Sequence, residues 1–222
     1  MNDNKKILDL LKTKSSVKQE VFRNTLSVFE ELTRILKTKS SDLSKIMIEK
    51  DKFVEIGFSK KGNFESHINF SGDRLIFHMH TNIFDFPSNH SIHKSSYIKD
   101  DNMRSFCGVI HVYNFLNDSF KYNRLNDIGH LVARIFVNKD KHFFVEGQKQ
   151  LGLLYNNLAD QEISKDTLEE VVDNAIIFSL NFDLISPNFQ DINLVNVHQI
   201  IDMSISHKLR TSKSLGFKLS HE

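Results

Sequence analysis

The chain has almost no cysteine or proline and no tryptophan: among its 222 residues are one Cys, two Pro and no Trp. A single Cys107 excludes an intrachain disulfide and fits a reducing compartment. No signature of a cysteine nucleophile surrounds it, so we interpret it as a small buried hydrophobic residue.

An excess of one charge is also missing, since 29 basic residues balance 28 acidic ones to a net charge of +1. That balance argues against nucleic acid as a partner, because dedicated binders are strongly basic. No stretch approaches the roughly 18 apolar residues that span a bilayer, which argues against a membrane protein. The charged N-terminus lacks the apolar core of a signal peptide. We therefore expect a cytoplasmic protein.

The recognised catalytic and cofactor motifs are absent as well. The glycines form neither the dinucleotide-binding G-x-G-x-x-G nor a P-loop, and neither H-E-x-x-H nor G-x-S-x-G occurs. We expect no cofactor, and the sequence leans against an enzyme.

What is present is an ordinary globular composition, with 40% hydrophobic and 26% charged residues and 19 Phe. The length suits one α+β domain over residues 1–222. We divide it into an N-terminal helical segment (1–50), a sheet with one inserted helix (51–160), and C-terminal helices with a tail (161–222). Short links between strands predict a mostly antiparallel sheet of about five to seven strands, flanked by helices at both chain ends.

The clearest single signal is a β-hairpin within residues 123–147. Residues 130–137 alternate β-branched and aromatic side chains, and the polar run 138–141 reverses the chain into a second such strand. With a loop of residues 138–141, Arg134 faces Val145 and Glu146 faces Ala133. Arg134 and Glu146 then lie on opposite sides of the sheet, whereas Arg134 and His130 share one side.

Two helices are predicted before the sheet. Residues 4–11 form a short amphipathic helix, and Ser15 or Ser16 caps a longer one that runs to about Lys37. Phe22, Phe29 and Leu36 lie one heptad apart on the longer helix. Their stripe indicates docking onto the sheet, with a homodimer interface as the alternative. We interpret residues 37–52 as a polar connector, with another helical turn or two as the alternative.

Three strand-like runs follow, at residues 53–58, 64–70 and 74–84, separated by turns that contain Gly62 and Gly72. They predict an antiparallel meander that ends before Pro87, and residues 88–99 predict a surface loop.

Residues 101–122 fit both a strand, at 108–113, and a helix, and the length favours the helix. Residues 151–155 fit a third strand of the hairpin or a first helical turn. Ser164 caps the best C-terminal helix, which must stop before Pro187. Residues 197–205 suggest a final helix, and the basic tail 208–219 suggests a short edge strand.

The candidate site residues are mostly histidines. His78 and His80 are two positions apart on one predicted strand, so their rings point to the same face. His67 lies on the preceding strand, and the hairpin adds His130 and Arg134. A His-x-His pair with a third ligand suits zinc, but no carboxylate stands in register beside it. We assign no metal, with His78 and His80 as the only candidate ligands. The alternative is the partly wet face of a half-buried sheet.

These patterns favour a non-enzymatic binding or adaptor domain that forms a homo-oligomer, through the helix of residues 16–37 or a sheet edge. Its ligand would be a small molecule or a protein. The alternative is a small-ligand-binding or metal-dependent hydrolase domain that uses the histidine-bearing sheet face.

Overall fold

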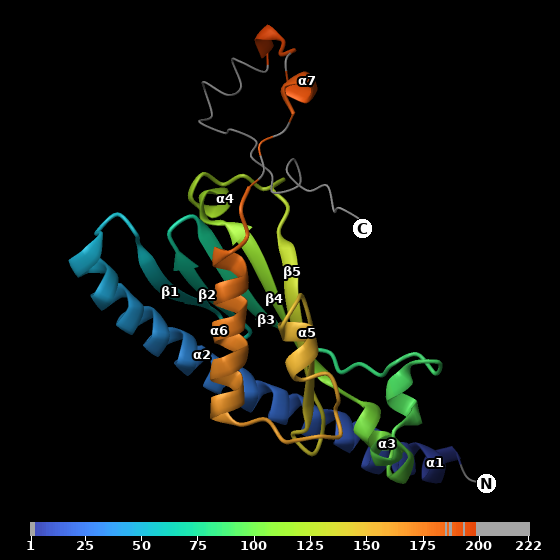
Figure 1. The fold of residues 1–222 in the computed structure, drawn as a ribbon. Coiled ribbons are helices and arrows are strands. Elements are labelled where there is room, and N and C mark those ends of the chain that lie inside the picture. Colours follow the sequence, from blue (N-terminus) through green and yellow to red (C-terminus); the bar gives the residue numbers. More distant parts are fainter. Residues whose placement is uncertain (1–2, 185, 187, 193, 199–222) are drawn as a thin grey trace.

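The fold is a six-stranded antiparallel meander with its two long helices on one face (Figure 1). The computed structural model describes residues 3–184, 186, 188–192 and 194–198. Neighbouring strands in the sheet are also neighbours in sequence, in the order β1-β2-β3-β4-β5-β6. The strands are β1 (Ile56–Lys61), β2 (Glu65–Phe70), β3 (Asp73–Met79), β4 (Gly108–Leu116), β5 (His130–Val137) and β6 (Phe143–Gly147). The predicted α+β class, with an antiparallel sheet and helices at both ends, is confirmed.

The N-terminal segment is helical without a break from residue 3 to residue 50. It consists of α1 (Asp3–Leu10), a π-helical turn η1 (Leu11–Ser15) and α2 (Ser16–Lys50). At 1.5 Å per residue the helix is about 70 Å long, and it extends past the sheet at both ends (Figure 1). The predicted cap at Ser15 or Ser16 is wrong, because Ser15 is itself helical and makes no capping bond.

The predicted connector over residues 37–52 is also wrong, since α2 continues to Lys50. Its Lys and Ser residues are compatible with helix, and no Gly or Pro interrupts residues 16–50. Ser40 continues the buried stripe, and Lys45 pairs with Asp42 on the exposed side. Polar composition therefore marked a solvated helix here, not a loop.

The main core lies between the sheet and two helices, α2 and α6 (Lys165–Leu180). Val28, Phe29, Leu32 and Leu36 of α2 pack there with Leu168 and Val172 of α6. The heptad stripe of α2 is therefore used for docking onto the sheet. Ser164 caps α6 as predicted, in a capping box with Thr167.

One glycine allows α2 to approach the sheet closely. Gly108 begins β4 directly beneath Thr25 of α2, and a Cβ at Gly108 would lie 2.1 Å from the Thr25 Oγ1. Both residues are fully or almost fully buried. A side chain at residue 108 would therefore push the helix off the sheet.

The first strands are shifted relative to the prediction. β1 runs to Lys61, so that Gly62, with a φ of 63°, makes the turn, and β3 ends at Met79. Beyond Met79 the chain bonds to the sheet again through Phe84 and Cys107. Residues 88–99 are not an open loop, because they include η2 (Ser91–Lys94) and α3 (Ser96–Asp100).

The helix predicted over residues 101–122 is wrong. β4 occupies the centre of this segment, between η3 (Asn102–Ser105) and α4 (Asn117–Lys121). The sequence fits both the helical period and the strand alternation, and pairing with β3 and β5 stabilises the strand. Asp101 caps the short η3, where its carboxylate accepts a hydrogen bond from the Met103 N–H. Residues 151–154 form the helical turn α5 (Leu151–Leu154), the second of the two alternatives for that segment.

The hairpin exists as predicted, but its register is wrong by one residue. Five residues, 138–142, connect β5 to β6, one more than expected. Val137 consequently pairs with Phe143, and Arg134 pairs with Glu146 directly across the strands. The predicted separation of Arg134 from Glu146 is therefore wrong.

Asn138 fixes that longer loop. Its side-chain oxygen accepts hydrogen bonds from the backbone N–H groups of Asp140 and His142, both at 3.0 Å. Its amide nitrogen donates to the Tyr97 hydroxyl (3.0 Å) and to the Arg104 carbonyl (3.3 Å). One fully buried side chain thus closes the hairpin and ties it to the segment before β4.

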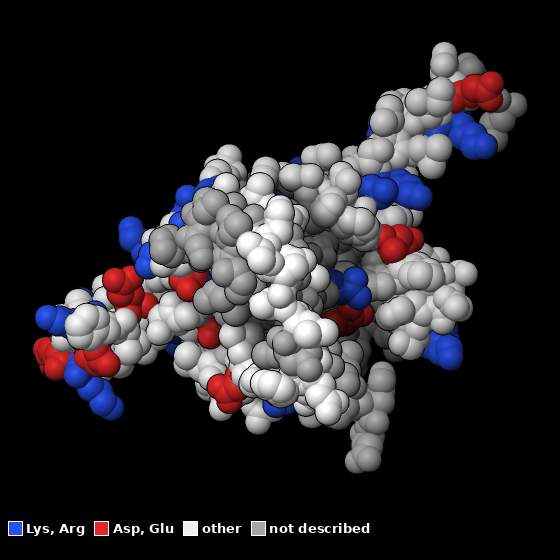
Figure 2. Space-filling view, turned by 90° about the horizontal axis from the view of Figure 1, so that it is seen from above, with Lys and Arg blue, Asp and Glu red and all other residues white. Residues whose placement is uncertain are grey.

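The predicted tail strand and nearly all of the predicted last helix lie outside the described residues. No helix within the described part of the chain is long and apolar enough to cross a membrane. Seen from above, acidic and basic side chains are interspersed over the surface (Figure 2).

Candidate functional site

The two faces of the sheet differ in what covers them. The face toward α2 and α6 carries the main core, including Ile68, Phe77 and Ile110. The opposite face, which we call the open face, is covered by apolar side chains only near its ends. At one end Val109, Phe136 and Phe144 pack with residues of the 86–98 segment and Leu158. At the other, Phe120 of α4 lies over His67, with 6.0 Å between ring centroids.

Between these covered ends lies a row of ionisable side chains, one from each strand, which we call the cross-sheet row. Lys61 pairs with Glu65, Glu65 with His78, and His78 with His111. His111 pairs with Arg134, and Arg134 with Glu146. Directly paired residues point to the same face, so the six side chains form one line across the sheet. All keep part of their surface exposed.

One end of the row is ion-paired. The Arg134 guanidinium bonds to the Glu146 carboxylate, and it also lies over the Phe136 ring, 5.2 Å from the centroid. Because both side chains are more than a third exposed, at 41% and 36%, the pair contributes about 1 kcal/mol to stability at most. The folded state therefore gains little from this pair.

The centre of the row favours neutral imidazole. Burial lowers the pKa of His111, and the positive charge of Arg134 and the neighbouring His78 and His80 lower it further. The His111 ring stacks on Tyr113, with 5.7 Å between centroids and 18° between planes. His111 therefore offers a neutral hydrogen-bonding ring beside the Arg134 cation.

His67 lies on the open face in the neighbouring cross-strand line, but it is buried. Its Nε2 lies 2.6 Å from the Glu65 carboxylate. Burial lowers the pKa of His67, and the bond to Glu65 offsets this in part. His67 thus positions the Glu65 carboxylate through this contact. Because His67 is buried, it is not itself available to a ligand.

His80 follows β3 and lies at the margin of the row. Its Nδ1 accepts a hydrogen bond from the Asn82 backbone N–H at 3.0 Å, and its ring lies edge-on to Phe84. His78 and His80 share the open face, as predicted from their spacing. In the described chain no three His, Cys, Asp or Glu side chains are grouped so as to hold a metal ion.

His130 does not belong to this group, so the prediction that it shares a face with Arg134 is wrong. The register shifts within β5: Ala133 pairs with Val112, but Leu131 pairs with Tyr113. Val132 is the extra residue of a bulge, which reverses the alternation of the residues before it. His130 consequently lies on the helix-covered side, near the Phe182 ring that follows α6.

Sequence reasoning misses Lys61, Glu65 and His111 and misplaces Glu146. Glu65 pairs directly with His78, so the expectation that no carboxylate stands in register beside that histidine is wrong. The alternation of residues 108–113 is the signal for His111, but the helical period of the longer segment competes with it. Burial of Cys107 raises the pKa of its thiol, in keeping with its interpretation as an apolar residue. Arg124 and Asp127 form a buried ion pair, and Ser119 donates to Asp127 at 2.6 Å. These three residues brace the turn before β5.

The chain matches no protein-family model, and comparisons with the curated proteins and with the solved structures also find no match. Its function is therefore inferred from the chemistry and geometry of its own side chains.

Proposed function

We propose that the protein is a non-enzymatic binding or adaptor domain that docks an acidic, extended polypeptide segment across the open face. The observation that carries this proposal is the cross-sheet row. Charged side chains are depleted in strands, and an ion pair as exposed as that of Arg134 and Glu146 adds little stability. A row of six ionisable side chains is therefore better explained by a ligand than by a contribution to stability.

The spacing of the row suits an extended chain. Neighbouring strands lie about 4.8 Å apart, so the five intervals from β1 to β6 span about 24 Å. An extended segment covers that distance with about seven residues. Such a segment, lying across the strands, would contact one row residue per strand.

The charge of the face favours an acidic partner. Lys61, Arg74 and Arg134 are basic, whereas Glu65 and Glu146 are acidic, and His78 and His111 lie between them. A carboxylate at the centre of the row would meet the Arg134 guanidinium and two imidazole rings. Charge-assisted hydrogen bonds of this kind are the stronger class.

The test is fluorescence anisotropy with a fluorescein-labelled peptide in which Glu and Ser alternate, so that every Glu lies on one face of an extended chain. Arg134→Gln should weaken binding at least about tenfold, which corresponds to one lost charge-assisted contact. Glu146→Gln should strengthen binding, because it releases Arg134 from its partner.

The matched control is Arg23→Gln, which makes the same charge change on an exposed position of α2. If Arg23→Gln weakens binding as much as Arg134→Gln, the attraction is general and the proposed site is wrong. Absence of saturable binding to the folded wild-type protein would refute the proposal as well.

We further propose that self-association uses the edge of β1. The other edge strand, β6, is covered by the segment that follows α5, since the Val145 N–H donates to the Tyr155 carbonyl. Directly before β1, the Glu55 carbonyl accepts a hydrogen bond from the Ser71 N–H, so it points toward the sheet. Alternation then directs the backbone groups of Ile56, Phe58 and Lys60 away from β2. A second copy can pair with these groups and extend the sheet.

A further inference from the structure

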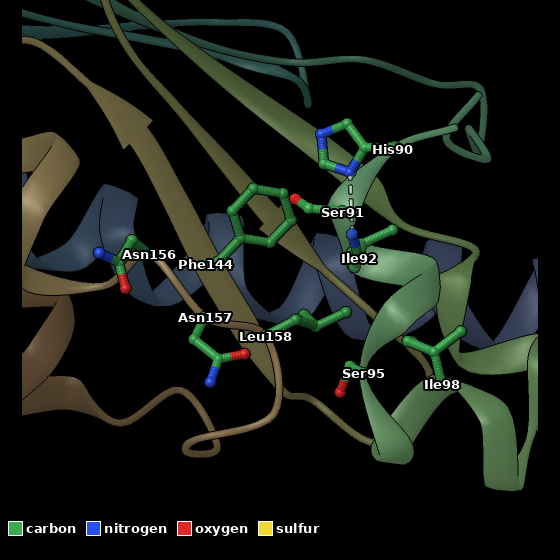
Figure 3. Close-up of a pocket in the computed structure, with 9 residues that line it drawn as sticks. All are labelled: His90, Ser91, Ile92, Ser95, Ile98, Phe144, Asn156, Asn157 and Leu158. Carbon is green, nitrogen blue, oxygen red and sulfur yellow. Dashed lines mark hydrogen bonds between the residues drawn. The ribbon is translucent and has the colours of Figure 1, made fainter. Parts of the chain in front are cut away.

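A small cavity lies over β6, apart from the cross-sheet row. Its volume is about 140 Å³. Figure 3 shows its walls: His90, Ser91, Ile92 and Ser95 on one side, Asn156 and Asn157 on the other, and the Phe144 ring between them. The two walls are separate chain segments, both packed on the open face of the sheet.

The inner part of the cavity is apolar and aromatic. Ile98, Leu158 and Phe144 are almost fully buried there, and Ile92 packs against the same cluster. The Phe144 ring is held flat, because it stacks on Phe136 with 4.7 Å between centroids and 8° between planes. A ligand ring would therefore meet a fixed aromatic surface.

The rim is polar, and several of its side chains have hydrogen-bonding groups that other side chains do not use. Among the described residues, no side-chain hydrogen bond is made by Ser91, Ser95 or Asn156. The Nδ1 of His90 accepts from the Ile92 N–H at 3.3 Å, so a neutral His90 ring carries its proton on Nε2 and can donate. These four side chains offer both donors and acceptors at the mouth.

Size and charge define the ligand class. A dry apolar cavity of about 150 Å³ is known to hold benzene, so this cavity is large enough for one six-membered ring. None of its nine lining residues is Lys, Arg, Asp or Glu. A charged ligand would lose its hydration without gaining an ion pair.

We propose that this cavity binds a neutral, monocyclic aromatic compound that carries one hydrogen-bonding substituent. The ring lies against Phe144 among Ile92, Ile98 and Leu158, and the substituent bonds to the rim. The site is independent of the acidic segment proposed for the cross-sheet row, and the two can be tested separately.

The experiment is a titration of methyl-labelled protein with phenol, followed by NMR. Saturable shifts are expected in the methyl groups of Ile92, Ile98 and Leu158. Ser91→Phe, which places a ring at the mouth, should weaken phenol binding at least about tenfold. The matched control, Ser96→Phe, lies on the exposed side of α3 and does not line the cavity, so it should leave binding unchanged.

Asn156→Ala serves as a second variant that leaves the interior intact. It should weaken phenol and leave benzene unaffected, because only the substituent loses a partner. Benzoate, with the same ring and a negative charge, should bind at least about tenfold more weakly than phenol. The proposal is overturned if these three methyl groups show no saturable shift, if folded Ser91→Phe binds phenol normally, or if benzoate binds as well as phenol.

Discussion

Replacing Asn138 with Ala is expected to destabilise the protein through the hairpin loop. The substitution removes four hydrogen bonds from a residue with no exposed surface. In two of them the Asn138 side-chain oxygen accepts from the backbone N–H groups of Asp140 and His142. An alanine side chain has no acceptor to replace it. An unsatisfied buried donor costs about 1–3 kcal/mol, and water that enters the opened loop recovers part of this.

The expected loss in the free energy of unfolding is therefore about 3 kcal/mol. With a urea slope of about 3 kcal/mol per molar, the unfolding midpoint should fall by about 1 M. Amide exchange should accelerate at Asp140 and His142 more than at the centre of β5. Both are measurable, by urea denaturation followed by circular dichroism and by hydrogen exchange followed by NMR.

The matched control is Asn126→Ala, at an exposed position in the turn before β5. It should change stability by less than about 0.5 kcal/mol. If Asn138→Ala costs less than about 1 kcal/mol, or if the control costs as much, the Asn138 side chain does not hold the loop and the reasoning fails.

Three other outcomes are expected. Gly108→Ala should lower the free energy of unfolding by about 1–3 kcal/mol, because its new methyl group meets Thr25. In a double-mutant cycle measured by urea unfolding, Thr25→Ala should relieve part of that loss. Additive effects of the two substitutions would contradict the close approach. Stability should fall as the pH drops below 6.5, because the pKa values of His67 and His111 are lowered in the folded state and the unfolded chain takes up protons first. Replacing both histidines with Gln should therefore flatten the pH dependence of the thermal unfolding temperature. An unchanged slope would refute this cause. Lys60→Pro should reduce any concentration-dependent mass seen by light scattering, since it removes an outward N–H of the β1 edge; association that survives the substitution would exclude that edge.

The elements that local chemistry defines could be predicted from the sequence. Ser164 and the apolar period after it specify α6, and the alternation on either side of residues 138–141 specifies a hairpin. Neither prediction needed knowledge of distant contacts. The same reasoning failed for β4, where helix and strand periods coincide and the pairing partners β3 and β5 decide.

The candidate site was harder to predict, because register decides which side chains meet. Asn138 imitates a backbone acceptor and so stabilises a loop one residue longer than the polar run indicates. That residue brings Glu146 opposite Arg134. The bulge at Val132 likewise moves His130 to the other face. Neither the length of a loop nor the position of a bulge can be read from the alternation of apolar and polar residues, so the register could not be predicted.

The cross-sheet row has a consequence for the register of the strands. Each strand contributes one ionisable residue to the row, and the residues on either side of it along β2 to β6 are mostly core. If any of these strands slipped by one position, Glu65, Arg134 or Glu146 would face α2 and α6. Burying such a charge without its partner costs several kcal/mol. Misregistered meanders are therefore penalised, and the row favours the same strand alignment that the loop around Asn138 produces.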